Sequence, residues 1–390
     1  MPATLIKNGR VILKDRILDG ASVLVRGAKI ACAGMPRAPA GASVIDARGS
    51  YISPGFIDTH IHGGPDDIMR NDVKGGTTSI IVAESCAPAA GIFKRKDALE
   101  ELMRRDTLGS AVLGFRMEGP FISKNKAGAQ DSRYIKRPDK KELGAIIGRC
   151  APILKMMTVA PELEGALPAI RSMVSQGVCA SIGHSNASCA QAAGGIRAGI
   201  SHATHMFNAM RHTTSRDPGV VGAVLSDRNV WAEIILDLIH VHKALFGLLM
   251  QAKGPEKVLL VTDSVRACRQ KGVRKKDGAY RFADGSLSGS ALTMISAVRN
   301  AVRCGLPLAG AVRLASYNPT KMLGIHRRKG SIESGKDADI VIFNKDFRVK
   351  LTMIGGRIVY RSSSVVIGAC SSNVRDNRIH RFQKRPGSSP

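Results

Sequence analysis

The chain has 390 residues, with 58 Lys and Arg against 31 Asp and Glu, so its formal net charge at pH 7 is +27. With 44% hydrophobic and 23% charged residues, the composition is that of a globular protein and excludes disorder throughout. No run approaches the roughly 18 uncharged apolar residues of a membrane span, and the N-terminus lacks a signal-peptide pattern. We therefore expect a cytoplasmic protein whose charge favours anionic partners.

The N-terminal residues 1–53 are rich in short β-type runs. These runs are 4–6, 11–13, 22–25, 29–32 and 43–46. Asn-Gly, Asp-Gly and Arg-Gly turn signals separate them, which predicts small antiparallel sheets.

From residue 54 to about residue 327, short apolar runs alternate with helix-like stretches. The strand candidates are 79–82, 112–117, 155–159, 178–182, 202–204, 231–236 and 258–261. The alternation predicts a parallel sheet, either open or closed into a barrel.

Residues 328–365 return to short strands, so we expect the two β-rich ends of the chain to form one small sheet domain. Residues 366–390 are expected to form a basic, flexible tail. The eight cysteines are scattered without a Cys-x-x-Cys pair, which favours free thiols in a reducing compartment.

Histidines and carboxylates stand at five predicted strand ends. They are His60 and His62, Glu118, His184, the group of His202, His205 and Asn208, and Asp263. Alone, each is compatible with an ordinary hydrogen-bonded side chain, and His202 and Asn208 fit a structural role equally well. In a barrel, however, strand ends gather on one face, where catalytic groups sit. His60 and His62 project from the same side of a strand and can share a metal ion.

Imidazole and carboxylate ligands with an open position are typical of a hydrolytic metal site. Such a metal lowers the pKa of its bound water to about 7 and polarises a carbonyl group. An aspartate at the last strand end, Asp263, can then act as general base and acid.

With these motifs in place, the chain resembles the N-acetylglucosamine-6-phosphate deacetylases of the amidohydrolase superfamily, from its N-terminus to about residue 360. The resemblance rests on residues 53–63, 117–122, 183–188, 204–210, 261–263, 287–294 and 335–340. The Glu-Gly-Pro, Gly-His-Ser-Asn-Ala and His-x-x-Asn-Ala-Met segments among them are the most specific to the deacetylases. The resemblance implies an α/β fold, a distorted TIM-type (β/α)8 barrel over residues 54–327. It also implies a small β-sandwich made of residues 1–53 and 328–365.

The resemblance also implies a ligand set and a reaction. Glu118, His184 and His205 would bind the main metal, and His60 and His62 a second metal that some members contain. One or two divalent ions per subunit are expected, zinc first, with iron, manganese or cobalt as alternatives. A metal-bound hydroxide would attack the acetyl carbonyl of N-acetylglucosamine 6-phosphate, releasing acetate and glucosamine 6-phosphate in amino-sugar catabolism. Asp263 would serve as base and acid.

Substrate contacts follow from the same resemblance. They would be Ala129, Asn208, Ala209, Arg216, Asp237, Leu238, Ile239, His240, Leu292, Thr293 and Met294. His240 would orient or polarise the carbonyl oxygen. Members of the family are usually homodimers, in which the counterpart of Arg216 reaches the phosphate bound by the partner subunit; its guanidinium fork suits a phosphate.

Three segments depart from the family pattern. Gln130 stands where many members have histidine, and Leu238 stands where glycine is usual. Either change can alter sugar specificity. The segment 264–282, which normally contributes a lid-like β element, is shorter and more basic than usual.

Two alternatives remain open from the sequence. The first is another amidohydrolase, acting on a different N-acetylated sugar or amino acid or on a cyclic amide; Glu118 at its strand end favours the sugar deacetylases. The second is a polyanion-binding protein on this fold. Its support is the charge, and an aromatic content of 4% argues against nucleic-acid binding by base stacking. A phosphosugar needs only one or two cations, so we expect the excess charge to steer anionic substrates or to have no role.

Overall fold

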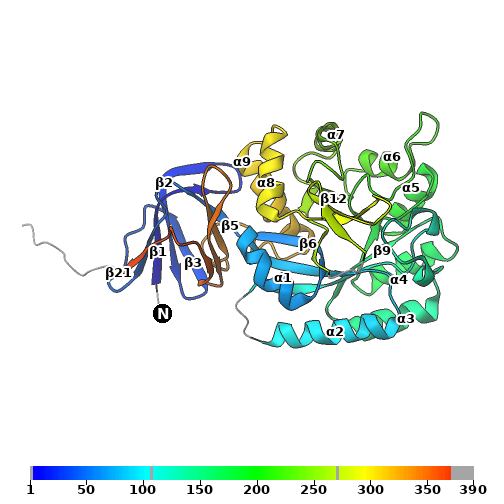
Figure 1. The fold of residues 1–390 in the computed structure, drawn as a ribbon, viewed down its shortest axis with the longest axis horizontal. Coiled ribbons are helices and arrows are strands. Elements are labelled where there is room, and N and C mark those ends of the chain that lie inside the picture. Colours follow the sequence, from blue (N-terminus) through cyan, green and yellow to red (C-terminus); the bar gives the residue numbers. More distant parts are fainter. Residues whose placement is uncertain (1–2, 106–108, 269–271, 370–390) are drawn as a thin grey trace, which may run out of the picture.

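The computed structural model describes residues 3–105, 109–268 and 272–369, which form two bodies side by side, a small sheet domain and a larger barrel (Figure 1). Among the helices described, none combines the length and apolar character that crossing a membrane requires.

The small domain is one nine-stranded sheet built from both ends of the chain. Its strands are β1 (Ala3–Ile12), β2 (Ile17–Arg26), β3 (Lys29–Gly34), β4 (Ser43–Asp46), β5 (Tyr51–Pro54), β18 (Ile340–Phe343), β19 (Val349–Ile354), β20 (Arg357–Arg361) and β21 (Ile367–Ala369). The main path runs β20-β19-β18-β5-β1-β2-β3. The antiparallel expectation is confirmed for β1–β2 and β2–β3, whereas β1 pairs in parallel with β4 and β5.

Aliphatic side chains fill the core of this sheet domain. Ile6, Val23, Ile45, Ile52 and Leu351 are fully buried there. The two ends of the chain meet where β5 pairs antiparallel with β18, with Pro54 opposite Ile340 and Tyr51 opposite Phe343.

The expectation of a flexible tail from residue 366 is wrong for its first residues. Ile367–Ala369 form β21, which pairs antiparallel with β4, because the exposed edge of β4 offers unpaired backbone groups. The rest of that predicted tail, 370–390, lies outside the described residues. The division of the chain at residues 53/54 and 327/328 stays a prediction.

The barrel has eight parallel strands in sequence order. They are β6 (Phe56–Gly63), β7 (Thr77–Glu84), β8 (Ala111–Glu118), β9 (Leu154–Val159), β10 (Cys179–Ile182), β11 (His202–Ala203), β12 (Trp231–Ile235) and β13 (Val258–Val261). Beyond β13, the chain enters β14 (Ser264–Ala267), whose Ser264 pairs with Ile61 of β6, and Asp263 N–H donates to the His60 carbonyl at 2.8 Å. The sheet therefore curls back on its first strand, and the predicted distorted barrel is confirmed.

Helices cover the outside of the curled sheet (Figure 1). They are α1 (Pro65–Asp72), α2 (Ala89–Arg104), α3 (Lys140–Cys150), α4 (Ala166–Ser175), α5 (Cys189–Ala198), α6 (Gly219–Ser226), α7 (Lys243–Lys253), α8 (Met294–Arg303), α9 (Leu308–Ala315) and α10 (Tyr317–Met322). Local sequence sets several of their starts. Asp139 caps α3, and Ser188 with Gln191 forms a capping box on α5, which satisfies backbone N–H groups that the first turn leaves free.

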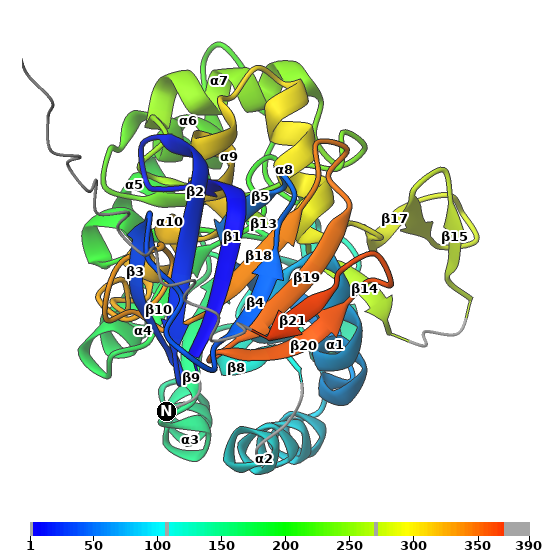
Figure 2. The same ribbon diagram turned by 90° about the vertical axis from the view of Figure 1, so that its left-hand side faces the viewer.

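The basic segment after β14 forms a projecting hairpin. It contains β15 (Arg274–Lys276), β16 (Ala279–Arg281) and β17 (Leu287–Ser290), and Figure 2 shows β15 and β17 standing away from the body of the barrel. The described part of segment 264–282 thus contains β-strands, as the corresponding segment of the family normally does.

Candidate active site

A cavity of about 700 Å³ opens at the carboxyl ends of the barrel strands. Its lining includes His62 from β6, Glu118 from β8, and His184, His205 and Asp263 from the loops that follow β10, β11 and β13. Residues from five separate strand ends thus meet in one place, as the sequence predicted, because parallel strands deliver their carboxyl ends to one face of a barrel.

The first group of donor atoms consists of Glu118, His184 and His205. Glu118 Oε1 lies 3.2 Å from His184 Nε2 and 2.9 Å from His205 Nε2, and these two nitrogens are 3.0 Å apart. His184 Nδ1 lies 2.9 Å from the Lys126 carbonyl oxygen, which accepts only, so Nδ1 carries the hydrogen and Nε2 presents a lone pair. Lone pairs that converge on one point in this way fit a divalent cation.

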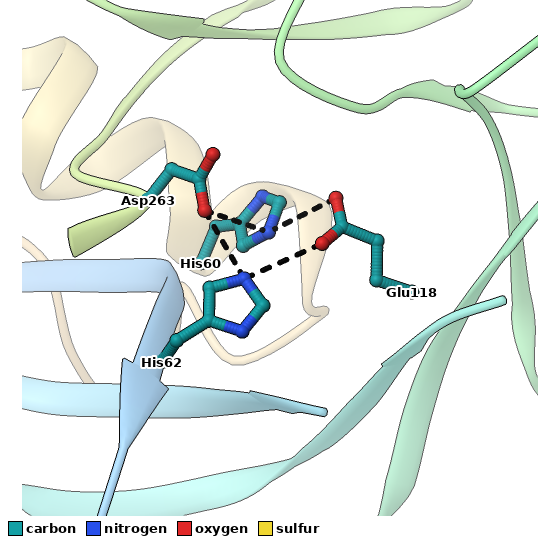
Figure 3. Close-up of side chains that lie close together, drawn as sticks. All are labelled: His60, His62, Glu118 and Asp263. Carbon is teal, nitrogen blue, oxygen red and sulfur yellow. Dashed lines mark ion pairs between the residues drawn. The ribbon is translucent and has the colours of Figure 1, made fainter. Parts of the chain in front are cut away.

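The second group consists of His60, His62, Glu118 and Asp263, whose side chains converge in Figure 3. Asp263 Oδ1 lies 3.5 Å from His60 Nε2 and 3.1 Å from His62 Nε2. Glu118 lies 3.4 Å from His60 and 3.3 Å from His62 through its two oxygens. His60 Nε2 is fully buried and has no hydrogen-bond partner among the residues that the structure describes, so this atom too fits a cation. Glu118 belongs to both groups and can bridge them.

The electrostatics of the cavity favour positive charge between its carboxylates. Burial opposes ionisation, yet the surrounding histidines hold the pKa of Glu118 well below its usual range, and His60 and His62 lower that of Asp263. Burial and Arg116 work to lower the pKa of His60, but the two carboxylates outweigh them and raise it to about 9. The two carboxylates therefore stay ionised, as metal ligands must.

Four predicted substrate contacts also line the cavity: Ala129, Asn208, Ala209 and His240. His240 Nδ1 lies 2.6 Å from Asp237 Oδ2, so the carboxylate fixes the imidazole and its tautomer. Gln130 donates to Glu118 Oε2 at 2.7 Å and accepts from the Cys86 N–H at 2.8 Å. The glutamine that departs from the family pattern therefore orients a candidate metal ligand.

The other predicted contacts lie outside this cavity lining. Arg216 is exposed in the loop between β11 and α6, and Leu238 is 40% exposed. Leu292 and Met294 are buried. Thr293 caps α8 and lines a separate cavity of about 310 Å³. Ile239 lines neither of the two cavities.

Arg95 is the one Lys or Arg among the described residues that line the main cavity. It lies 2.5 Å from Glu84, so its charge is already compensated, and it also donates to the Gly63 carbonyl. The cavity of a single chain thus offers little free positive charge for a phosphate.

Strained backbone conformations gather at the site. Of ten non-glycine residues with positive φ among those described, six lie in the loops around the cavity: His184, His205, Phe207, Ala209, Leu238 and Asp263. Such conformations persist only where surrounding structure enforces them, and they concentrate at functional sites. Leu238, with φ of 66°, occupies a conformation that favours glycine, which accounts for glycine at this position in the family pattern.

The sequence interpretation missed two fully buried charged residues below the donor groups, Arg116 in β8 and Glu233 in β12. Their side chains form an ion pair of 2.5 Å. A charged residue within an otherwise apolar strand is the signal that could have revealed each of them, since buried charges require partners.

A barrel whose strand ends carry histidine and carboxylate donors for a divalent cation is typical of metal-dependent hydrolases. The Amidohydrolase family model matches residues 51–359. The N-acetylglucosamine-6-phosphate deacetylase of Bacillus subtilis (strain 168) is 32% identical, over 92% of this chain and 97% of its own length. The N-acetylgalactosamine-6-phosphate deacetylase of Escherichia coli O157:H7 is also 32% identical, over 82% of this chain and 90% of its own length.

Solved structures agree with these relatives. The N-acetylglucosamine-6-phosphate deacetylase of Pasteurella multocida has a TM-score of 0.84 at 30% identity, covering 91% of this chain and 99% of its own. A mutant of the Mycobacterium smegmatis enzyme, in complex with N-acetyl-D-glucosamine-6-phosphate, has the same TM-score and identity, covering 92% and 100%. The chain therefore belongs to the amidohydrolase family, among the N-acetylglucosamine-6-phosphate deacetylases. The predicted resemblance is confirmed.

Proposed function

We propose that this enzyme hydrolyses the N-acetyl group of N-acetylglucosamine 6-phosphate to give glucosamine 6-phosphate and acetate. The observation that carries the proposal is the pair of donor groups that share Glu118 beside Asp263 in the 700 Å³ cavity. The named activities of the relatives from B. subtilis and P. multocida support the same substrate.

Glu118, His184 and His205 would hold the main divalent cation, and His60 and His62 would hold a second with Glu118 and Asp263. A bound cation would lower the pKa of a coordinated water to about 7 and polarise the acetyl carbonyl. We favour zinc, with iron, manganese and cobalt as alternatives that the same nitrogen and oxygen ligands accept.

The side chains of this chain supply the remaining steps. Asp263 stays ionised, so its carboxylate accepts a proton from the attacking water and later donates it to the leaving amine. His240, held through Nδ1 by Asp237, lines the cavity and would orient the acetyl group. Asn208 and Ala209 line the cavity wall where the sugar would lie.

The phosphate requires a cation that the cavity of one chain does not supply, because Arg95 is paired with Glu84. We propose that the enzyme is a homodimer in which Arg216 of one subunit binds the phosphate in the site of the other. Its exposed side chain, for which the structure gives no ion pair within the described residues, supports this role. The seven described cysteines are free, which supports a cytoplasmic location.

An acetate-release assay on the purified protein, loaded with zinc, tests the proposal. The substrates are the 6-phosphates of N-acetylglucosamine and N-acetylgalactosamine and the unphosphorylated sugars. We expect the fastest release from N-acetylglucosamine 6-phosphate and much slower release from both unphosphorylated sugars. Faster release from N-acetylgalactosamine 6-phosphate would instead indicate the substrate named for the E. coli relative. Gln130 and Leu238 would then be the first residues to replace with the His and Gly of the family pattern. No release from any of the four would contradict the proposal.

A further inference from the structure

A charged pair lies inside the barrel directly below the donor groups. Arg116 in β8 and Glu233 in β12 are both fully buried. Arg116 stands two residues before Glu118, and Glu233 two residues before Ile235, which lines the cavity. Because strand side chains alternate, both residues point to the barrel interior, one layer below the site.

The Glu233 carboxylate contacts both donor groups. Its Oε2 lies 3.1 Å from His60 Nδ1 and 3.4 Å from the backbone nitrogen of His205. Its Oε1 lies 2.5 Å from Arg116 and 2.9 Å from His202 Nε2. Arg116 also donates to the Thr59 carbonyl at 3.1 Å and to the Thr204 hydroxyl at 3.2 Å. The pair is thus fixed by several strands.

Stability alone does not account for this arrangement. The interior layers of such barrels are usually filled by branched apolar side chains. A buried ion pair costs as much in desolvation as it gains in attraction, and apolar replacements are often neutral or stabilising. The contacts of Glu233 with His60 and His205 indicate what the pair does instead.

The contact determines which nitrogen of His60 carries hydrogen. An ionised carboxylate only accepts hydrogen bonds, and Arg116 keeps Glu233 ionised. His60 Nδ1 must therefore carry a hydrogen, which leaves Nε2, facing Glu118 and Asp263, as the ring atom that would bind a cation there. His62 has no such constraint, because its Nδ1 lies 3.4 Å from the Ser85 hydroxyl, which can donate or accept.

We propose that Glu233 is a positioning residue that holds His60 as a ligand for the second cation, and that Arg116 keeps Glu233 in that role. This inference rests on the proposed function, in which the group of His60, His62, Glu118 and Asp263 binds a cation. The Arg116–Glu233 ion pair would thus help to retain that cation without contacting either the cation or the substrate.

Metal content after dialysis against excess zinc and then against buffer provides the test. Glu233→Gln replaces the carboxylate with an amide that can also donate, so His60 can place its hydrogen on Nε2. We expect two ions per chain in the wild type and one in this variant, with the second ion bound about 10- to 100-fold more weakly in a titration. Asp339→Asn is the matched control. It breaks a different buried ion pair, with Lys329, in the small sheet domain, and should leave two ions.

Glu233→Gln leaves Arg116 buried without its partner and can prevent folding, which circular dichroism would show. In that case the number of ions bound per chain is measured in the double variant Arg116→Met/Glu233→Gln, which buries no unpaired charge. Nitrogen-15 spectra of histidine-labelled, zinc-loaded protein add a second readout, because the His60 Nε2 signal should be that of a metal-bound nitrogen in the wild type and not in either variant.

The outcomes separate the two proposals. A wild type with two ions and folded variants that bind both with unchanged affinity would overturn this inference and leave the proposed function standing. Loss of both ions together would also overturn it, since Glu233 would then act on the whole site. A wild type with one ion, unchanged in His60→Ala/His62→Ala, would contradict the proposed second cation site and this inference with it.

Discussion

The interiors of the two sheets differ in what they bury. The small nine-stranded sheet covers a core of aliphatic side chains such as Ile6, Ile45 and Leu351. The barrel interior below the cavity instead buries Arg116, Glu233, His60 and His202, all at 0% exposure. The charged side chains at 0% exposure thus lie in the barrel, whereas the buried ion pair of the small sheet domain, Lys329 with Asp339, keeps 5% and 7% exposure.

The two kinds of interior therefore serve different purposes: buried aliphatic side chains stabilise the fold, and buried charged side chains fix the positions of their neighbours. Aliphatic burial contributes roughly 25 cal/mol per Å² without requiring any particular geometry of polar atoms. Buried charges contribute little net stability but must be satisfied by defined partners, so they fix the directions in which neighbouring side chains point. Substitutions in the barrel interior should therefore affect chemistry, and substitutions in the small sheet should affect stability.

The largest effect should come from the rim of the barrel. Asp263→Asn removes the proton acceptor while preserving size, so we expect kcat to fall about 10³-fold, equivalent to about 4 kcal/mol on the activation barrier. Steady-state acetate release would measure this, with metal content and melting temperature as controls. A fall of less than about tenfold with intact metal would mean that another group moves the proton.

The second largest effect should come from the aliphatic core of the small sheet, and it concerns stability. Ile6→Ala opens a cavity in the small-sheet core, and we expect unfolding free energy to fall by about 3 kcal/mol with kcat unchanged. Urea denaturation and acetate release, measured on the same preparation, separate the two quantities. If kcat fell in proportion to stability, the small sheet would contribute to the geometry of the site.

A third, smaller effect tests the proposed contact between Arg216 and the phosphate in a partner subunit's site. Arg216→Gln should raise KM for the phosphorylated substrate about 30-fold, or about 2 kcal/mol, as expected for a charged hydrogen bond. The unphosphorylated sugar should react as before. Arg211→Gln is a matched control in the same loop, because Arg211 already pairs with Asp217. Equal effects of the two substitutions would argue against a phosphate contact by Arg216.

The smallest effect concerns charge outside both interiors. The net charge of +27 includes the exposed Arg274, Lys275 and Lys276 of the hairpin. If this field steers the anionic substrate, kcat/KM should fall a few-fold, roughly threefold, as ionic strength rises from 0.02 to 0.3 M. The neutral sugar should show no such trend. A flat profile for the phosphorylated substrate would exclude steering.

The sequence predicted the fold and the donor groups for a physical reason. Parallel strands of a barrel bring their carboxyl ends to one face, so His60, Glu118, His184, His205 and Asp263 could be placed together from strand order alone. The small sheet was predicted from the short β-type runs at both ends of the chain.

Other features depend on distances that strand order does not determine. Arg116 and Glu233 lie 117 positions apart, and their pairing across the interior follows from barrel closure, which no local pattern specifies. The pairing of β21 with β4 was missed because a strand of three residues carries little signal in the sequence.

The antiparallel pairing of β5 with β18 also has a consequence for synthesis on the ribosome. β5 pairs with residues 340–343, so the small sheet cannot be completed until nearly the whole chain has left the exit tunnel. Until then β5 presents an open edge, and one residue beyond it the chain enters β6, which carries His60 and His62. Truncation before residue 340 should thus leave the nascent first barrel strand beside an unprotected edge, the form most exposed to misassembly.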